Sequence, residues 1–262
     1  MLIFQIPLKE GRSGRLKDLG NVVNFAHRGS SKICPENTMA AFKKALEQGA
    51  TGIETDVQLT KDGEPVLIHD ETLKRTTSGT GWVKDHTLNE LKELDAGSWF
   101  HPDFREERLP HLDELLELVQ DRGTIVNIEL KNGVVPYEGL EEKVIQRVRD
   151  HGLSSRVVIS SFNHYSLLLC KKLAPEIRTG ILYMEGLYEP WAYAGTLQAD
   201  ALHAYHHAVL PGFVAAAKAA GKAYHPFTVN DPNEMRRLLE AGVDGIITDY
   251  PDQLAALLAE GK

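Results

Sequence analysis

Residues 22–29 have the sequence VVNFAHRG, in which a β-branched, apolar run ends in a histidine, an arginine and a glycine. The run has the composition of a buried strand, and its polar residues stand at the carboxyl end. The same arrangement recurs in residues 52–57, GIETDV, and in residues 124–131, TIVNIELK. Reactive side chains therefore gather at strand ends, which is where parallel α/β folds bind their ligands.

Strand-like and helix-like segments alternate along most of the chain. Residues 38–48 are typical of the helices, because Met39, Phe42 and Leu46 repeat at helical spacing. Asn37 is expected to cap this helix, and Gly49 to end it. The other expected helices are residues 112–121, 138–150, 163–173, 186–196, 207–220, 231–241 and 250–260. The expected strands are residues 22–26, 52–57, 124–130, 156–160, 178–183, 200–204, 222–229 and 244–248.

Eight strands that alternate with helices favour parallel pairing, and the chain length fits a (β/α)8 TIM barrel. We expect one such domain across residues 1–262, with residues 1–20 as an N-terminal extension outside the repeating pattern. A doubly wound open sheet is the alternative. It is disfavoured because no Gly-x-Gly-x-x-Gly motif follows the first strand.

A further strand-like segment, residues 65–69, follows residues 52–59 after a short turn that contains Asp62 and Gly63. A parallel crossover needs about a dozen residues or more, so this pair is predicted to be an antiparallel hairpin extension of the second strand. The hairpin returns His69 to the level of Asp56. Residues 70–111 are predicted to form a small insertion, either a lid over the barrel mouth or a segment packed outside it.

Bulk composition excludes several classes of function. The net charge is −8 and no basic stripe is present, so nucleic-acid binding is not expected. No apolar stretch approaches the roughly 18 residues of a transmembrane helix, and the N-terminus lacks the features of a secretory signal. We expect a cytoplasmic protein without stable membrane insertion, with Cys34 and Cys170 as free thiols. A homo-oligomer is compatible with the sequence.

Three carboxylates are candidates for a metal site. Glu54 and Asp56 stand two apart on one strand, so their side chains point the same way, and Glu129 ends another strand. Three carboxylates at one level of a barrel repel one another unless a cation lies among them. Ligands that are all oxygen suit Mg²⁺ or Ca²⁺ rather than zinc.

Two histidines and two cations are candidates for catalysis on an anionic substrate. His27 and His69 form the obvious proton-transfer pair, because histidine titrates near neutral pH. Arg28 and Lys131 supply the positive charge that a phosphate group needs. Each feature alone is common in structural roles, and Glu129 with Lys131 resembles an ordinary ion pair. Their joint occurrence at several strand ends favours a functional site.

A second group of histidines stands near the seventh strand. His203, His206 and His207 lie within five residues of one another, but no familiar metal-binding spacing fits them. We expect these side chains to have surface or packing roles.

An ordered series of motifs resembles the glycerophosphodiester phosphodiesterase family of bacterial, cytoplasmic type. The resemblance extends over residues 21–252 and is specific because its motifs follow one another in order. These motifs are His27-Arg28-Gly29, Pro35-Glu36-Asn37-Thr38, residues 52–63, His69-Asp70, residues 95–100, Glu129-Leu130-Lys131, Ser160-Ser161-Phe162, Thr228-Val229-Asn230 and residues 244–249.

The resemblance implies a TIM barrel that hydrolyses glycerophosphodiesters to sn-glycerol 3-phosphate and an alcohol. Residues that match Glu54, Asp56 and Glu129 hold Mg²⁺ or Ca²⁺, and those that match His27 and His69 are the acid and base. Arg28 and Lys131 match phosphate-binding residues. Glu36 belongs to the signature, and its expected place is near the metal or the glycerol. Phe227 stands where the family often has tryptophan, after Pro226, so the pocket wall keeps an aromatic ring but loses an indole N–H.

Three alternatives stay open at this point. A lysophospholipase D would need an apolar groove beside the mouth, for which Trp82, Trp99 and Phe100 are candidates. A metal-dependent sugar isomerase or aldolase could use the same barrel. A non-catalytic binding protein is disfavoured, because no expected catalytic residue is missing. For the diesterase, either the glycerol 2-hydroxyl or water could attack the phosphorus.

Overall fold

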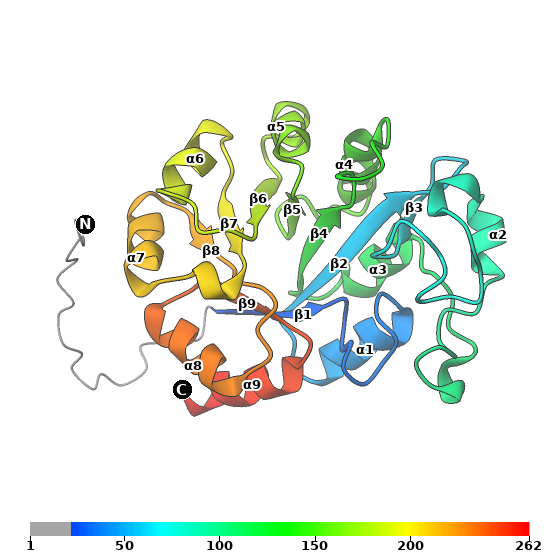
Figure 1. Cartoon of the computed structure of the whole chain (residues 1–262), viewed down its shortest axis with the longest axis horizontal. Coiled ribbons are helices and arrows are strands. Elements are labelled where there is room, and N and C mark those ends of the chain that lie inside the picture. Colours follow the sequence, from blue (N-terminus) through cyan, green and yellow to red (C-terminus); the bar gives the residue numbers. More distant parts are fainter. Residues whose placement is uncertain (1–21, 262) are drawn as a thin grey trace.

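The structure is a computed structural model that describes residues 22–261. The N-terminal extension expected at residues 1–20 lies outside the described residues. Eight parallel strands form the centre, in the order β8-β7-β6-β5-β4-β2-β1-β9 (Figure 1). They are β1 (Val23–His27), β2 (Gly52–Leu59), β4 (Ile125–Leu130), β5 (Val157–Ser161), β6 (Arg178–Tyr183), β7 (Ala201–Ala204), β8 (Ala223–Tyr224) and β9 (Gly245–Thr248).

The two ends of this sheet meet, which makes it a barrel rather than an open sheet. The Ile247 N–H donates to the Pro226 carbonyl at 3.0 Å, and the Val229 N–H donates to the Ile247 carbonyl at 2.9 Å. These bonds join the segment after β8 to β9. The predicted (β/α)8 barrel is therefore confirmed, and the doubly wound alternative is wrong.

Helices surround the barrel, as Figure 1 shows. They are α1 (Met39–Glu47), α3 (Leu112–Val119), α4 (Leu140–Asp150), α5 (His164–Leu173), α6 (Pro190–Thr196), α7 (Pro211–Ala219), α8 (Pro232–Ala241) and α9 (Pro251–Glu260). One prediction about a helix end is wrong. Thr38, not Asn37, caps α1 and accepts from the Ala41 N–H, whereas Asn37 has a φ of 55° and turns its side chain toward β2.

Glycines open space for one large ring inside the barrel. Phe25 on β1 is fully buried, and its strand partner on β2 is Gly52. A Cβ atom at Gly52 would lie 2.5 Å from the Phe25 ring, and one at Gly245 on β9 would lie 3.0 Å from it. Side chains at either glycine would therefore exclude the ring. Phe25 fills this part of the interior in place of side chains from both neighbouring strands.

The predicted hairpin extension is confirmed. Strand β3 (Pro65–Leu67) pairs antiparallel with the end of β2, where Val57 faces Leu67. The Ile68 N–H then donates to the Asp56 carbonyl at 3.1 Å, so the chain returns to the level of Asp56 just before His69. A short antiparallel strand pair thus delivers His69 to the barrel mouth without adding a strand to the barrel.

Residues 70–111 form a small insertion at the flank of the barrel, beside β3 and around α2 (Leu88–Lys92) (Figure 1). It also contains the short 3-10 helices η2 (Val83–Asp85) and η3 (Pro102–Phe104). Leu73, Val83, Leu91 and Leu109 form its apolar core together with residues of the hairpin. This separate core explains why a segment of low periodicity still folds.

The strand expected at residues 222–229 is shorter than predicted. Regular strand β8 ends at Tyr224, because Pro226 has no N–H to donate to a ladder. The chain still follows the barrel, since the Phe227 N–H donates to the Ala204 carbonyl at 3.0 Å. The irregular backbone leaves Phe227 at the mouth of the barrel.

Candidate active site

A cavity of about 210 Å³ opens at the carboxyl ends of the barrel strands. Seven of the nine residues expected in the site line it: His27, Arg28, Glu54, His69, Glu129, Lys131 and Phe227. Asp56 and Glu36 lie behind this wall. The apolar part of the lining comes from Phe162, Leu182, Phe227 and Ile247.

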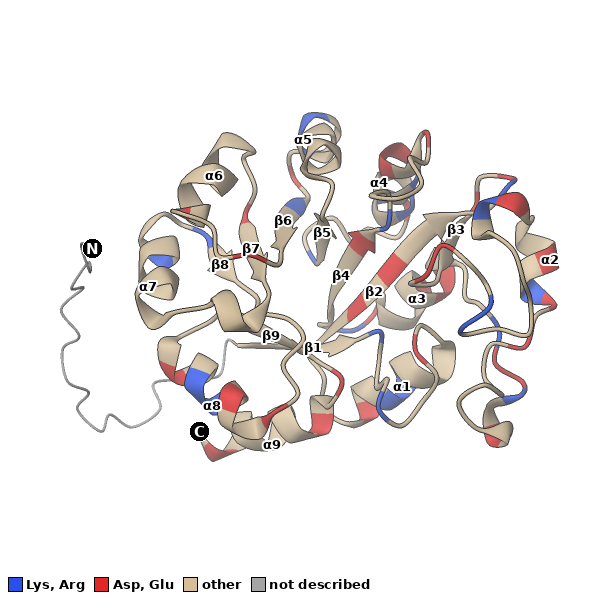
Figure 2. Ribbon diagram, in the orientation of Figure 1, with Lys and Arg blue, Asp and Glu red and all other residues tan. Residues whose placement is uncertain are grey.

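The three expected carboxylates converge on one point. Asp56 on β2 faces Glu129 on β4 in the strand register, and Glu54 lies two residues before Asp56. Figure 2 shows the acidic positions of β2 and β4 side by side in the barrel. One oxygen from each of Glu54, Asp56 and Glu129 lies within 4.8 Å of the other two. The prediction that these side chains share a face is confirmed.

Negative charges on all three of these carboxylates are unfavourable unless a cation lies near them. Burial raises the pKa of Glu54 well above its ordinary value, and the charges of Asp56 and Glu129 raise it further. Burial and the charge of Asp56 also raise the pKa of Glu129, to about 7. Burial opposes the charge on Asp56 too, but Arg28, His69 and Lys131 together hold its pKa below the ordinary value.

The residues present fit a divalent metal ion. The Oδ1 atom of Asp56 is buried and has no hydrogen-bond partner, which is costly for a carboxylate oxygen unless a cation binds it. All three candidate ligands offer oxygen atoms, as hard divalent ions prefer. The carboxylate cluster is therefore a candidate metal site.

Asn37 belongs to this site, although the sequence placed it as a helix cap. Its side-chain amide donates to Asp56 Oδ2 at 2.9 Å, and its amide oxygen accepts from the Thr55 hydroxyl at 2.8 Å. The left-handed backbone at Asn37 aims the side chain inward, a conformation that asparagine tolerates better than most residues. Asn37 fixes the orientation of Asp56, so that Oδ1 is the oxygen that accepts no hydrogen bond.

His27 has a carboxylate partner that sequence reasoning did not assign. Its Nδ1 lies 2.6 Å from Oδ1 of Asp249, which directly follows β9. Asp249 also accepts hydrogen bonds from Ser31 and Asn230. Burial opposes the charge on Asp249, yet these bonds and His27 hold its pKa down at about 2. The His27 ring is thus oriented by an ionised carboxylate.

His69 lies between a carboxylate and an ammonium group. Its Nδ1 is 2.8 Å from Asp70 Oδ1, and its Nε2 is 3.2 Å from Nζ of Lys131. Because an ammonium group can only donate, Nε2 accepts and the proton resides on Nδ1. Burial, with Arg28 and Lys131 nearby, lowers the pKa of His69 despite the attraction of Asp56 and Asp70. His69 is therefore neutral at neutral pH.

Arg28 is held by acidic groups on two sides. Its Nη1 donates to Glu36 Oε1 at 2.9 Å, and its Nε lies 3.2 Å from Asp56 Oδ2 at an angle outside hydrogen-bond geometry. Glu36 in turn binds Arg75 of the insertion. Glu36 was expected near the metal or the glycerol. In the structure it does not line the cavity and lies between Arg28 and Arg75.

The aromatic residues of the insertion lie away from the cavity. Trp82 and Trp99 are 41% and 40% exposed, and within the described chain no residue of the 70–111 insertion lines the cavity. The aromatic wall comes instead from Phe162 after β5 and from Phe227, whose rings meet edge to face with centroids 6.1 Å apart. The groove expected for a lysophospholipase from Trp82, Trp99 and Phe100 is therefore not part of this cavity.

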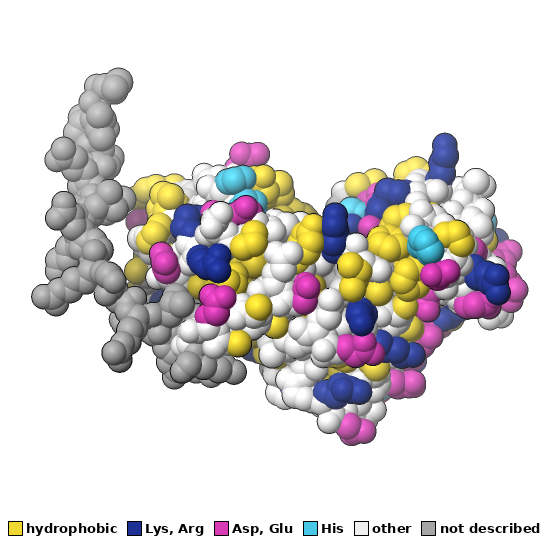
Figure 3. All heavy atoms as spheres, turned by 90° about the horizontal axis from the view of Figure 1, so that it is seen from below, with side chains coloured by type: hydrophobic (Ala, Val, Ile, Leu, Met, Phe, Trp, Pro, Cys, Tyr) yellow, Lys and Arg dark blue, Asp and Glu magenta, His cyan; other side chains and the backbone are white. Residues whose placement is uncertain are grey.

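One face of the molecule shows a mixed distribution of charge. On the face seen in Figure 3, acidic and basic side chains are interspersed and do not gather into a basic stripe. Within residues 22–261, none of the helices is both long and apolar enough to cross a membrane. Both cysteines are buried free thiols, as predicted.

Comparison with known proteins identifies the class of protein to which this chain is similar. Residues 27–253 match the model of the glycerophosphoryl diester phosphodiesterase family. A glycerophosphodiester phosphodiesterase of Caldanaerobacter subterraneus subsp. tengcongensis is 52% identical over 90% of this chain and 98% of its own length. A phosphodiesterase of Oleispira antarctica, solved with the product sn-glycerol-3-phosphate, superposes with a TM-score of 0.82 at 36% identity, covering 90% of this chain and 96% of that chain.

The chain belongs to the glycerophosphoryl diester phosphodiesterase family. It is an enzyme, a phosphoric diester hydrolase that acts on glycerophosphodiesters. This membership removes the isomerase or aldolase and the non-catalytic binding protein from the alternatives.

Proposed function

We propose that this enzyme releases sn-glycerol 3-phosphate and a free alcohol from small glycerophosphodiesters, with His27 and His69 as the acid and base. One observation carries this assignment: both imidazoles line a single cavity that also contains two carboxylates of the candidate metal site. A phosphate group in a cavity of this size lies within reach of both. The product bound to the Oleispira antarctica relative supports the choice of substrate class.

The two histidines have surroundings that favour different roles. His69 is neutral and accepts at Nε2, so it is suited to take a proton from the attacking hydroxyl or water. His27 donates from Nδ1 to ionised Asp249, and this bond fixes the orientation of the ring. We assign His27 the complementary role, protonation of the leaving alkoxide. Each step could contribute about 10²–10⁴-fold in rate.

Positive charge around the cavity is suited to the phosphate. Arg28 and Lys131 both line the cavity, and we propose that they bind the phosphoryl oxygens. Glu36 keeps the Arg28 guanidinium in place. Phe227 and Phe162 form an apolar part of the same lining, against which the non-reacting part of the diester would pack.

We propose that the candidate metal site of Glu54, Asp56 and Glu129 holds Mg²⁺ or Ca²⁺. A divalent ion there would polarise the phosphoryl oxygens and lower the pKa of a bound hydroxyl or water. The oxygen-only donor set supports this choice over zinc. The free Oδ1 of Asp56 supports it as well.

A coupled assay for glycerol 3-phosphate tests the proposal across several diesters. Glycerophosphocholine and glycerophosphoethanolamine should be hydrolysed in Mg²⁺ or Ca²⁺. Cleavage of lysophosphatidylcholine yields lysophosphatidic acid rather than glycerol 3-phosphate, so it is followed by choline release; this diester should be a poor substrate because no apolar groove extends the described cavity along the insertion. His69→Ala should reduce the rate by about 10²-fold or more. Full activity of that variant, or a preference for lysophosphatidylcholine, would contradict the proposal.

Analysis of all phosphorus-containing products during early turnover separates the two routes of attack. A glycerol 1,2-cyclic phosphate that appears and then disappears indicates attack by the glycerol 2-hydroxyl. Direct release without this compound, together with failure to hydrolyse it when supplied, indicates attack by water.

A further inference from the structure

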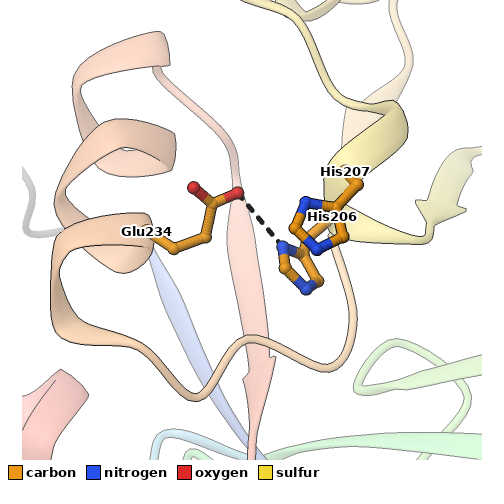
Figure 4. Close-up of side chains that lie close together, drawn as sticks. All are labelled: His206, His207 and Glu234. Carbon is orange, nitrogen blue, oxygen red and sulfur yellow. Dashed lines mark hydrogen bonds and ion pairs between the residues drawn. The ribbon is translucent and has the colours of Figure 1, made fainter.

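A second group of potential metal ligands lies outside the cavity, where three side chains meet (Figure 4). His206 and His207 belong to the 3-10 helix η4 (His206–Ala208) that follows β7, and Glu234 lies in the first turn of α8. One ligand atom from each lies within 4.8 Å of the other two. The two imidazole centroids are only 4.0 Å apart.

The spacing of these atoms is close to what a tetrahedral ion requires. His206 Nδ1 lies 3.1 Å from Glu234 Oε1. Zinc bonds of about 2.0–2.1 Å to nitrogen and oxygen place neighbouring tetrahedral ligands roughly 3.3 Å apart. A metal ion could therefore replace this hydrogen bond with little movement of either side chain. His207 is exposed and is free to turn toward the same point.

Arg237 already orients the Glu234 carboxylate through hydrogen bonds, as the partners of metal ligands do in established metal sites. Arg237 donates from Nε to Glu234 Oε2 at 2.8 Å and from Nη2 to Oε1 at 2.6 Å. It also donates to the Val209 carbonyl at 3.0 Å, which ties α8 to the end of η4. Carboxylate ligands normally have such partners, and each oxygen retains a lone pair for a metal. Arg237 thus prepares the site, although its positive charge limits the affinity.

The donor set selects a different metal from the one expected in the cavity. Two imidazoles with one carboxylate and one open position form a common environment for zinc, whereas Mg²⁺ and Ca²⁺ prefer oxygen ligands. We propose that His206, His207 and Glu234 bind one zinc ion, with solvent in the fourth position. The sequence did not indicate this site, because Glu234 stands on the next helix, far from the histidine pair in the chain.

The site lies directly behind the wall of the catalytic cavity. The His206 N–H donates to the Phe227 carbonyl at 2.9 Å, and Tyr205 forms a parallel bridge with Phe227. An ion that joins η4 to α8 would brace the backbone that carries Phe227. Its role is therefore structural, and catalysis in the cavity does not require it.

Zinc titration against a chromophoric chelator tests the proposal on the whole chain, in excess Mg²⁺ so that Mg²⁺ competes with zinc at the carboxylate cluster. Wild type should bind a zinc ion that His207→Ala and the double variant His206→Ala/His207→Ala lose. Glu234→Gln, which keeps the side-chain shape and one of its two hydrogen bonds with Arg237, should weaken zinc binding at least about tenfold. His101→Ala, which removes an exposed histidine of the insertion, is the matched control and should bind as wild type does.

Two outcomes would overturn the proposal. One is zinc binding of equal stoichiometry and affinity in the double variant. The other is unchanged affinity in Glu234→Gln, which would mean that exposed imidazoles alone capture the ion. X-ray absorption at the zinc edge should show two imidazoles per ion in wild type. Diester hydrolysis by His207→Ala in Mg²⁺ should equal that of wild type, so loss of zinc binding and loss of the proposed catalytic function are separate results.

Discussion

Arg75 in the insertion donates to both carboxylate oxygens of Glu36, each at 2.8 Å. The same guanidinium donates to both oxygens of Asp70, at 2.7 and 2.8 Å. Glu36 holds Arg28, and Asp70 holds His69. One side chain of the insertion therefore orients a phosphate-binding candidate and a proton-transfer candidate, although it does not line the cavity.

Arg75→Ala should lower kcat/KM for glycerophosphocholine by about 10–100-fold, as is usual when a partner of an active-site residue is lost. Arg75→Lys should fall in between, because an ammonium group cannot make two paired contacts at once. Kinetics and a thermal melt of each variant give the measurement. Arg105→Ala removes an exposed arginine from the same insertion and is the control. A normal kcat/KM in Arg75→Ala would show that the network is dispensable.

Some residues of this site could be predicted from the local sequence pattern, whereas others depend on contacts between distant segments. Glu54, Asp56 and Glu129 could be predicted because strand periodicity puts residues two apart on one face. His69 could be placed because a short turn forces an antiparallel hairpin. Both arguments depend on backbone geometry that a few neighbouring residues determine.

Hydrogen-bond partners between distant segments could not be predicted in this way. Asp249 meets His27 across more than two hundred residues, and Arg75 meets Glu36 across 39 residues. No periodicity links such pairs. Asn37 was misplaced because its residue type is equally suited to a helix cap, and its left-handed backbone becomes visible only in the fold.

Asp249→Asn should lower kcat by about 10²–10⁴-fold, because the variant keeps the shape near His27 but removes the ionised carboxylate that orients the His27 ring and fixes its tautomer. Steady-state kinetics with glycerophosphocholine measure this loss. Asp252→Asn changes an exposed aspartate in the first turn of α9 and should leave the rate unchanged. If Asp249→Asn retains the wild-type kcat, His27 does not act through this carboxylate.

Lys131→Gln should move the acid limb of the kcat/KM profile to higher pH. His69 must be neutral to accept a proton, and burial together with Arg28 and Lys131 lowers its pKa. Removal of one cation favours the imidazolium, so the pKa rises and activity is lost sooner as the pH falls. Lys61→Gln, on the exposed hairpin turn, is the control for a general charge effect. An unmoved limb would argue against His69 as the titrating base.

Two buried histidines in the barrel should make the fold sensitive to acid. His225 Nδ1 lies 3.0 Å from His203 Nε2, and burial lowers the pKa of His225 from 6.5 to about 4. The unfolded chain binds a proton at this residue below about pH 6.5, whereas the native chain does so only near pH 4, so stability falls as the pH drops between these values. The difference amounts to about 3 kcal/mol at most.

His225→Asn tests this pH dependence. The asparagine amide can still reach His203 but does not titrate. Urea unfolding at pH 7 and at pH 5 should therefore show a smaller loss of unfolding free energy in the variant than in wild type. Equal losses in the two proteins would exclude His225 as the source, whatever the variant's stability at pH 7.

The most direct test of the account is the rate of sn-glycerol 3-phosphate release from glycerophosphocholine after metal removal. We expect the chelated enzyme to be inactive, and Mg²⁺ or Ca²⁺ to restore the rate in wild type but not in Asp56→Asn. That variant removes the charge of the carboxylate whose Oδ1 accepts no hydrogen bond. A full rate in the presence of chelator, or normal restoration in Asp56→Asn, would contradict the central claim that these carboxylates bind a divalent ion for catalysis.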